Sequence, residues 1–167
     1  MDDKTFLKDV SILRDLDEAE LRAFSTIARA LQIPRGTSIL KEGESGDTMY
    51  ILADGTVEVS KALTRIAGAE EFPGRDKILS KLSASNHAVF GEVALFEQKT
   101  RTATVVALSE CRLLEVKKSD FLGLAEKNPR LGYKVTRNIA ELLCSRLRKT
   151  NEDTMKLTTA LSLALSR

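Results

Sequence analysis

The sequence predicts a mainly β protein with flanking helices: an antiparallel, jelly-roll-like β-roll (double-stranded β-helix) between an N-terminal helix and C-terminal helices. From Pro34 to about residue 116, the apolar residues recur with a period near two, and turn residues arrive at short intervals. On both sides of this stretch the apolar period lengthens to that of a helix. Many short strands with frequent turns are typical of antiparallel sandwiches and rolls.

The composition is that of one soluble globular domain. The chain has 167 residues, of which 43% are hydrophobic and 30% are charged, and this balance excludes both a disordered chain and a fibrous repeat. The formal net charge is only +2, from 26 basic and 24 acidic residues, which is too small for a general attraction to nucleic acid. We therefore expect any anion-binding site to be local.

Cysteine usage and hydropathy predict a cytoplasmic protein. Cys111 and Cys144 lie far apart, so they form neither a disulfide framework nor a metal-ligand pair, and a reducing compartment is the simplest setting. The first residues lack the basic segment and apolar run of a signal peptide. No stretch approaches the roughly 20 apolar residues that a membrane span requires, so we expect no membrane partner.

The first helix is expected over residues 17–31. Asp17 is its expected N-cap, and Glu20 three residues later completes a capping box. Pro34-Arg35-Gly36 breaks the helix. The apolar residues of the segment share one helical face: Leu21, Phe24, Ile27, Ala28 and Leu31.

Strands are expected on either side of glycine-containing turns. In residues 56–61, Val57 and Val59 alternate with polar residues, as in a half-buried strand. Residues 64–76 hold Gly and Pro among charges and are expected to form a long exposed loop or hairpin tip. The other expected strands cover residues 48–52, 103–108 and 111–116.

The C-terminal part is expected to be helical and to form its own unit. A helix stops at Asn128, which can cap the next helix with Pro129 at its first position. We divide the chain into a β-roll domain with its N-terminal helix, residues 1–130, and a C-terminal helix and tail, 131–167, that act as a lid or a dimerisation element. The long helix carries an apolar stripe of Leu131, Val135, Ile139, Leu142, Leu143 and Leu147. We expect its basic residues to be a solvated face rather than a nucleic-acid site: Lys134, Arg137, Arg146, Arg148 and Lys149.

The segment from Phe90 to Val105, FGEVALFEQKTRTATV, contains a candidate anion site. Gly91 and Ala94 are small enough for the backbone to approach a ligand closely, and Arg101 follows as an isolated basic residue. Backbone N–H groups of a single helical turn and a guanidinium can together bind phosphate oxygens. Glu92 would repel phosphate, so it is expected to face another part of the ligand, such as a sugar hydroxyl.

With these residues the sequence resembles the cyclic-nucleotide-binding domain family and its phosphate-binding cassette. The matching cassette residues are Phe90, Gly91, Glu92, Ala94, Leu95, Arg101, Thr102 and Ala103. A second match covers residues 39–59, ILKEGESGDTMYILADGTVEV, in which Gly43, Gly46, Asp47, Tyr50, Ile51 and Gly55 resemble the family's pattern of strands and turns. The two ordered motifs occur within a matching β-roll, and the resemblance reaches to about residue 148.

The resemblance implies a role for each candidate residue. The backbone from Gly91 through Val93 to Ala94 and the side chain of Arg101 would bind the cyclic phosphate, and Glu92 would bind the ribose 2′-hydroxyl. Thr102 would lie near the phosphate or the base and does not decide between cAMP and cGMP. The remaining candidate ligand-binding residues are Phe90 and Ala103. In the family's transcription-factor branch the long helix dimerises and a helix-turn-helix domain follows, so we expect a homodimer through this helix but no direct DNA binding by this chain.

Ordinary structural roles remain open for the two charged candidates. Arg101 could pair with Glu92 or Glu97 on a surface loop, and Glu92 could be a helix-terminus charge. His87 is the single histidine of the chain and is assigned no role.

Two functions are compatible with these residues. The first is a regulatory sensor in signal transduction that binds cAMP or cGMP, needs no further cofactor, and couples binding to movement of the C-terminal helix. The second is a structural or dimerisation domain with a degenerate cyclic-nucleotide-binding fold and no ligand. An enzyme is not expected, because one histidine cannot make the multi-histidine metal site of a cupin. No Ser/His/Asp or Cys/His constellation can be assembled either, since His87 is the only candidate base of its kind. No metal site and no catalytic residue are therefore predicted.

Overall fold

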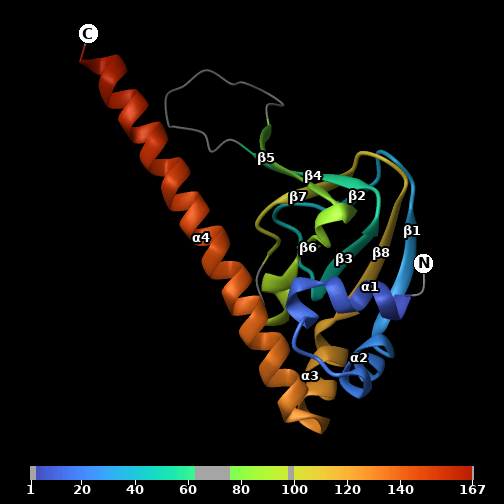
Figure 1. Ribbon diagram of the computed structural model, residues 1–167. Coiled ribbons are helices and arrows are strands. Elements are labelled where there is room, and N and C mark those ends of the chain that lie inside the picture. Colours follow the sequence, from blue (N-terminus) through green and yellow to red (C-terminus); the bar gives the residue numbers. More distant parts are fainter. Residues whose placement is uncertain (1–2, 63–75, 98–99, 167) are drawn as a thin grey trace.

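In this computed structural model, which describes residues 3–62, 76–97 and 100–166, eight strands form two four-stranded antiparallel sheets (Figure 1). The strands are β1 (Ala28–Ile33), β2 (Ser38–Leu40), β3 (Thr48–Asp54), β4 (Thr56–Ala62), β5 (Asp76–Ser83), β6 (Val89–Phe90), β7 (Thr104–Ala107) and β8 (Cys111–Lys117). The first sheet has the order β1-β8-β3-β6 and the second has the order β2-β7-β4-β5. The predicted fold class is confirmed.

Alternating apolar residues form the strands of the second sheet. Val57 of β4 lies opposite Ala107 of β7, and Val59 lies opposite Val105. Pairs of β-branched and small side chains pack well across an antiparallel ladder, and their apolar sides face the interior of the roll. This part of the core also contains Leu40, Tyr50, Leu52, Phe90, Cys111 and Leu113.

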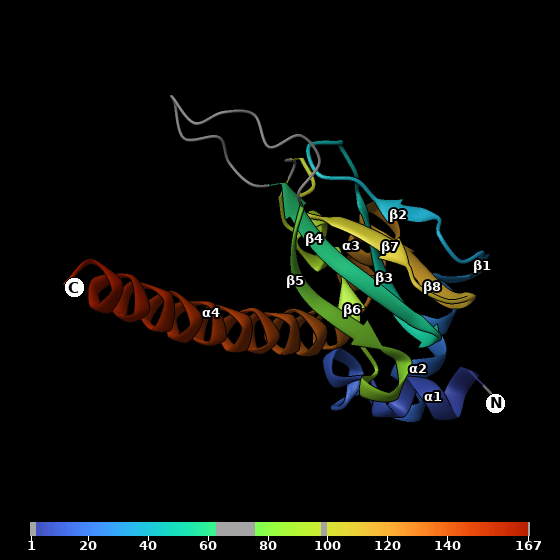
Figure 2. The same ribbon diagram turned by 90° about the horizontal axis from the view of Figure 1, so that it is seen from above.

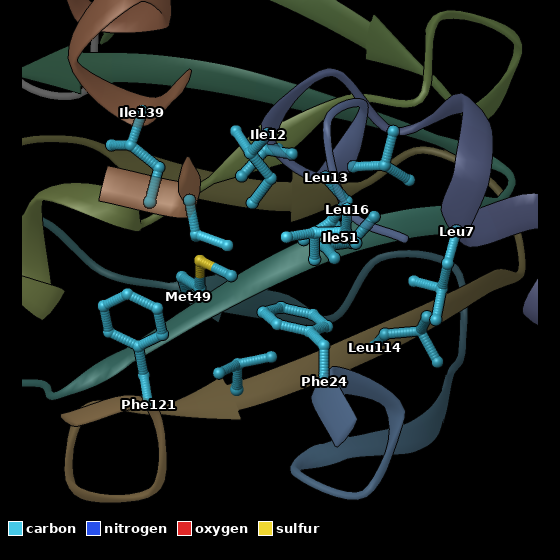
Figure 3. Close-up of a cluster of buried hydrophobic side chains, with 14 of the residues drawn as sticks. Leu7, Ile12, Leu13, Leu16, Phe24, Met49, Ile51, Leu114, Phe121 and Ile139 are labelled. Atoms are coloured by element: carbon cyan, nitrogen blue, oxygen red, sulfur yellow. The ribbon is translucent and has the colours of Figure 1, made fainter. Parts of the chain in front are cut away.

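Helices cover the first sheet and complete a larger core. They are α1 (Asp3–Asp9), the 3-10 turn η1 (Ser11–Leu13), α2 (Glu18–Ser25), α3 (Lys118–Lys127) and α4 (Pro129–Leu165). Figure 3 shows Phe24 of α2, Phe121 of α3 and Ile139 of α4 converging on β3. Each of these three side chains is at most 1% exposed, so the N-terminal and C-terminal helices share one hydrophobic core with the sheet.

The predicted helix over residues 17–31 is wrong in its second half. Its capping box is confirmed, but α2 ends at Ser25, and residues 28–33 form β1. Ala28 lies opposite Val116 of β8, and the register continues to Ile33 opposite Cys111. Six residues of ladder with a neighbouring strand outweigh a helical pattern that rests on a few apolar positions, because strand pairing is a tertiary contact that sequence periodicity does not contain.

Three further strands escaped prediction, and one predicted loop cannot be compared. Neither the turns nor the apolar period indicated β2, β5 or the two-residue β6. The loop expected at residues 64–76 lies outside the described residues except for Asp76, with which β5 begins. Strand β5 pairs with β4 from Asp76 to Ser83 with one shift in register, and this pairing forms the edge of the second sheet.

The long helix α4 begins as predicted and extends beyond the body of the roll. The side chain of Asn128 accepts a hydrogen bond from the N–H of Leu131 at 3.1 Å, and Pro129 takes the first helical position. The 37 residues of α4 give the helix a length of about 55 Å. Both views show the C-terminal half leaving the roll (Figures 1 and 2). Among the described residues no helix is both long and apolar enough to cross a membrane.

The basic face of α4 is not simply solvated, in contrast to the prediction. Lys134 forms an ion pair with Glu20 of α2 at 2.6 Å, and Arg137 pairs with Asp15. The buried side chain of Asn138 donates a hydrogen bond to the carbonyl of Ile12 at 3.2 Å. The first half of α4 is therefore fastened to the N-terminal helices by polar contacts as well as by apolar packing.

Candidate functional site

The candidate site is built on a single helical turn that follows β6. Gly91 has a φ of +74°, a left-handed conformation that glycine adopts without strain, and it leads into the 3-10 turn η3 (Glu92–Leu95). A Cβ at Gly91 would lie 3.0 Å from the carbonyl oxygen of Thr48. Glycine is thus needed here both for the backbone conformation and for the close approach to β3.

Arg101 points inward from the segment before β7. Its Nη1 donates to the carbonyl oxygen of Thr48 at 2.7 Å, and its Nη2 donates to Thr48 Oγ1 at 2.8 Å. Burial lowers the pKa of the Arg101 guanidinium, but an arginine remains charged at neutral pH. The surface pairing with Glu92 considered above is not found, since Glu92 pairs with another arginine.

Gly46 makes room for this guanidinium. A Cβ at Gly46 would lie 2.5 Å from both Nε and Nη2 of Arg101, closer than real Cβ atoms approach other atoms. The glycine is part of the turn that precedes β3, and the backbone N–H of Arg101 bonds the carbonyl of Glu44 in the same turn at 2.8 Å. The two motifs noted in the sequence, residues 39–59 and the cassette, therefore meet at Arg101.

A chain of hydrogen bonds continues from Arg101 into the roll. Thr48 Oγ1 donates to the hydroxyl of Tyr50 at 3.1 Å, and this hydroxyl donates to Glu115 Oε1 at 3.2 Å. Burial raises the pKa of Tyr50, so the phenol stays protonated and able to donate. Phe90 stacks on the Tyr50 ring with centroids 5.4 Å apart. These contacts hold Thr48, and with it the guanidinium, in one orientation.

A small cavity of about 70 Å³ lies beside Arg101. Small-molecule pockets usually enclose roughly 300–1,000 Å³, so this space suits a phosphate-sized group, and the rest of a larger ligand would extend outside it. Its walls include six of the eight predicted site residues: Gly91, Val93, Ala94, Arg101, Thr102 and Ala103. Four lining residues were not predicted as site residues: Leu40, Glu97, Thr100 and Val105.

Phe90 and Glu92 are the two predicted site residues that do not line the cavity. Phe90 packs under the site against Tyr50. Glu92 is only 3% exposed, and its Oε1 pairs with Nη1 of Arg146 from α4 at 2.6 Å. Arg146 also donates from Nη2 to the carbonyl of Val89 at 2.5 Å.

The sequence contained no local sign that Arg146 would reach the cassette, because 54 residues separate it from Glu92. His87, which was assigned no role, has a φ of +46° at the end of a short turn and packs its ring 5.3 Å from that of Phe6. Within the described ranges, no three His, Cys, Asp or Glu side chains come together as a metal site would require.

Comparison with known proteins assigns this arrangement to a family. The family profile described as "Cyclic nucleotide-binding domain" matches residues 30–128, which include both sides of the cavity. The chain belongs to the cyclic nucleotide-binding domain family. The resemblance drawn from the sequence motifs is confirmed.

Relatives of this cyclic nucleotide-binding domain occur in kinases and in transcriptional regulators. This chain is 31% identical over 116 residues to a cAMP-dependent protein kinase regulatory subunit of Yarrowia lipolytica, and the match covers 70% of this chain and 28% of that protein. It is 24% identical over 147 residues to the CRP-like cAMP-activated global transcriptional regulator of Mycobacterium tuberculosis, covering 88% and 59%.

A solved structure extends the likeness to the fold. The Thermus thermophilus catabolite activator protein matches with a TM-score of 0.73 and 25% identity, covering 89% of this chain and 63% of that one. The domain therefore spans less than two thirds of each of these three proteins.

Proposed function

We propose that this domain is a regulatory sensor that binds cAMP or cGMP beside Arg101 and couples binding to the position of α4. One observation carries the proposal: a half-buried guanidinium, held by two hydrogen bonds to Thr48, faces a phosphate-sized cavity walled by Gly91, Val93 and Ala94. A cation that is already desolvated and oriented binds an anion with less loss of entropy than a mobile surface arginine. The relatives named for cAMP add support.

In this proposal a different part of the protein contacts the phosphate, the sugar and the base of the nucleotide. The cyclic phosphate would lie in the cavity against Arg101 and the first N–H groups of η3, with Thr102 and Ala103 at its border. The sugar and base would extend outside the cavity, the sugar towards Glu92 and the base towards α4. Binding of this kind breaks no covalent bond, so we propose a binding module without catalytic residues or a metal.

Coupling to α4 follows from where the helix touches the site. Arg146 of α4 is bonded to both Glu92 and the carbonyl of Val89, so a change at the cassette acts directly on the helix. To move a two-state helix from 1:99 to 99:1, a ligand must favour one position by about 5.5 kcal/mol. A charged ligand in a partly buried site can supply energies of that order.

We also propose that a second copy of the chain covers the outer half of α4. Leu147, Leu157 and Leu161 are each about 60% exposed. They belong to a series in which steps of three and four residues alternate: Leu147, Thr150, Thr154, Leu157, Leu161 and Ala164. This spacing is that of a coiled-coil heptad seam, which pairing with a second copy of the helix would bury. Both cysteines are free, which suits the reducing cytoplasm proposed for the protein.

A second candidate function is a scaffold that has kept the fold without the ligand. The small volume of the cavity, about 70 Å³, favours it. A scaffold and a sensor differ in one measurable respect, which is the affinity of the folded protein for a cyclic phosphodiester.

Isothermal titration calorimetry with cAMP, cGMP, a cyclic dinucleotide and AMP tests the proposal. We expect micromolar or tighter binding of cAMP or cGMP, weak or no binding of AMP, and no measurable binding by Arg101→Ala at micromolar ligand, because about 1.5–3 kcal/mol of charge-assisted contact is removed. Arg29→Ala, an exposed arginine of β1, is the control and should bind like the wild type. Undiminished affinity in Arg101→Ala would contradict the assignment, and no binding by the wild type would favour the scaffold.

A further inference from the structure

Four side chains form a continuous line of hydrogen bonds that leads away from the cavity to β8. Nη2 of Arg101, which lines the cavity, donates to Thr48 Oγ1 at 2.8 Å. Thr48 Oγ1 donates to the Tyr50 hydroxyl at 3.1 Å, and this hydroxyl donates to Glu115 Oε1 at 3.2 Å. We call these four side chains the relay. Its far end, Glu115, belongs to β8 and does not line the cavity.

The carboxylate at the far end sets the direction of every hydrogen bond in the relay. A carboxylate only accepts and a guanidinium only donates, whereas a hydroxyl can do both. Burial raises the pKa of Tyr50, so its phenol keeps the proton that it donates to Glu115. The hydroxyl hydrogen of Thr48 is then directed at Tyr50, and the lone pairs of Thr48 Oγ1 are left to face Arg101.

The first sheet holds the middle of the relay in place. Tyr50 of β3 lies opposite Glu115 of β8 and opposite Phe90 of β6, so the three side chains stand in one row on the same face. The Phe90 ring stacks on that of Tyr50, which is only 8% exposed. Thr48 lies two residues before Tyr50 and therefore shares this face of β3. The Tyr50 hydroxyl thus has little freedom to leave Glu115.

We infer that Glu115 is a positioning residue for recognition of the phosphate: it acts through the relay to hold the guanidinium of Arg101 in one orientation. This inference rests on the proposed function. In a chain of hydrogen bonds each bond polarises the next, so a negative charge at one end strengthens the bond at the other. Arg101 contacts the ligand, and Glu115 acts on the ligand only through the relay.

A guanidinium with one orientation distinguishes the two exocyclic oxygens of a cyclic phosphate. Its N–H groups lie in one plane at fixed angles, so one of the two oxygens receives the charge-assisted bond in preference to the other. A guanidinium that is free to rotate would bond either oxygen. The relay therefore adds a choice between the two oxygens to the gain in affinity.

The relay also keeps the charge of Glu115 away from the phosphate. A carboxylate bonded directly to Arg101 would compete with the phosphate for the guanidinium and would repel it. The groups that contact the guanidinium are instead neutral, namely the carbonyl oxygen and the hydroxyl of Thr48. The relay thus orients the cation without neutralising it.

The first test uses Tyr50→Phe, which removes the hydroxyl but keeps the ring that stacks on Phe90. The ligands are cAMP, or cGMP if the domain prefers it, and the two phosphorothioate isomers in which sulfur replaces one exocyclic oxygen or the other. Tyr50→Phe should bind the nucleotide roughly threefold to tenfold more weakly, as expected for one hydrogen bond, and should bring the affinity ratio of the two isomers closer to one. Tyr133→Phe, a 66% exposed tyrosine of α4, is the control and should keep the wild-type affinity and ratio. A purely structural role would weaken both isomers equally and preserve the ratio.

The second test uses Glu115→Gln, which removes the charge but keeps the size of the side chain. The amide can donate to the Tyr50 hydroxyl as well as accept from it, so the direction of the relay is no longer fixed and the isomer ratio should fall. Adding Glu115→Gln to Tyr50→Phe should weaken binding no further, because the hydroxyl is the link between Glu115 and Arg101. Additive losses would show that Glu115 acts by another route. Thermal melts identify any variant that is unfolded.

A third measurement needs no ligand. Nitrogen-15 NMR of the arginine side chains reports the rate of rotation about the Nε–Cζ bond of Arg101. This rotation should be slower in the wild type than in Tyr50→Phe or Glu115→Gln, because both variants weaken the hydrogen bond that holds Nη2. Equal rates in all three proteins would overturn the positioning role.

The outcomes separate this inference from the proposed function. If the wild type binds a cyclic nucleotide and both relay variants keep its affinity and isomer ratio, the inference is wrong while the sensor remains. If the wild type binds neither cAMP nor cGMP, the proposed function fails and recognition of the phosphate fails with it. The rotation rates then still decide whether Glu115 orients Arg101.

Discussion

Gly46→Ala should displace the guanidinium of Arg101 without unfolding the domain. A Cβ at this position would lie 2.5 Å from Nε and Nη2 of Arg101 and 2.7 Å from its Cζ, whereas an ordinary contact is at least 3.4 Å. The end of the arginine side chain must therefore retreat by about 1 Å. The backbone of Gly46 is not left-handed, so alanine is compatible with its conformation.

The size of the effect follows from the hydrogen bonds that Arg101 makes. Its two bonds to Thr48 measure 2.7 and 2.8 Å, and a shift of about 1 Å takes both beyond the usual limit of roughly 3.2 Å. A guanidinium that has lost its fixed orientation loses much of a contact worth about 1.5–3 kcal/mol, which corresponds to a tenfold to roughly hundredfold loss of affinity. The free energy of unfolding should fall by no more than about 1–3 kcal/mol, because the hydrogen bonds to Thr48 are lost while the clashing group is the flexible end of a side chain.

Calorimetric titration of cAMP and cGMP into Gly46→Ala measures this loss, and denaturant unfolding measures stability. Gly123→Ala is the matched control, since a Cβ at Gly123 of α3 would meet no atom within 4 Å. It should bind like the wild type and gain roughly 0.5–1 kcal/mol of stability as a helical glycine replaced by alanine. Wild-type affinity in Gly46→Ala would refute the view that the orientation of Arg101 governs binding.

Two further predictions concern the helices. Asp17→Ala should lower the melting temperature at neutral pH, because the N–H of Glu20 donates to Asp17 at 2.9 Å and lowers the pKa of that carboxyl below 3.8. Because the pKa of Asp17 is lower in the folded state than in the unfolded state, the ionised carboxylate stabilises the fold above the unfolded pKa, and this stabilisation is lost as the pH falls through the folded pKa. The difference in melting temperature between Asp17→Ala and the wild type should therefore shrink below pH 3.8. A difference that is unchanged down to about pH 2 would contradict this explanation. The double variant Leu157→Glu/Leu161→Glu should be monomeric in analytical sedimentation. The control is Leu163→Glu, which should keep the mass of the wild type, because Leu163 is 67% exposed but lies off the heptad seam. Equal masses for the two variants would exclude the seam as the dimer contact.

The sequence by itself determined the class of fold and most of the residues that line the cavity beside Arg101. Strand alternation such as that of Val57 and Val59 is a local property, and a period of two places one face of each strand in the core wherever the strand pairs. The cap at Asn128-Pro129 is equally local, since it involves residues three apart. Gly91, Val93, Ala94 and Arg101 lie within one short segment, so their order along the chain was enough to group them around the cavity.

Tertiary structure decided the features that depend on distant partners. Residues 28–33 have apolar positions that fit a helix, and pairing with β8, more than 70 residues away, makes them a strand instead. Thr48 and Gly46 become part of the site because β3 passes beneath Arg101, and Arg146 does so because α4 lies across the cassette. Local propensity depends on a few neighbouring residues, whereas the partners of a buried charge are chosen by how the whole chain packs. For this reason most residues that line the cavity could be grouped from the sequence, and the pairing of Glu92 with Arg146 could be seen only in the folded molecule.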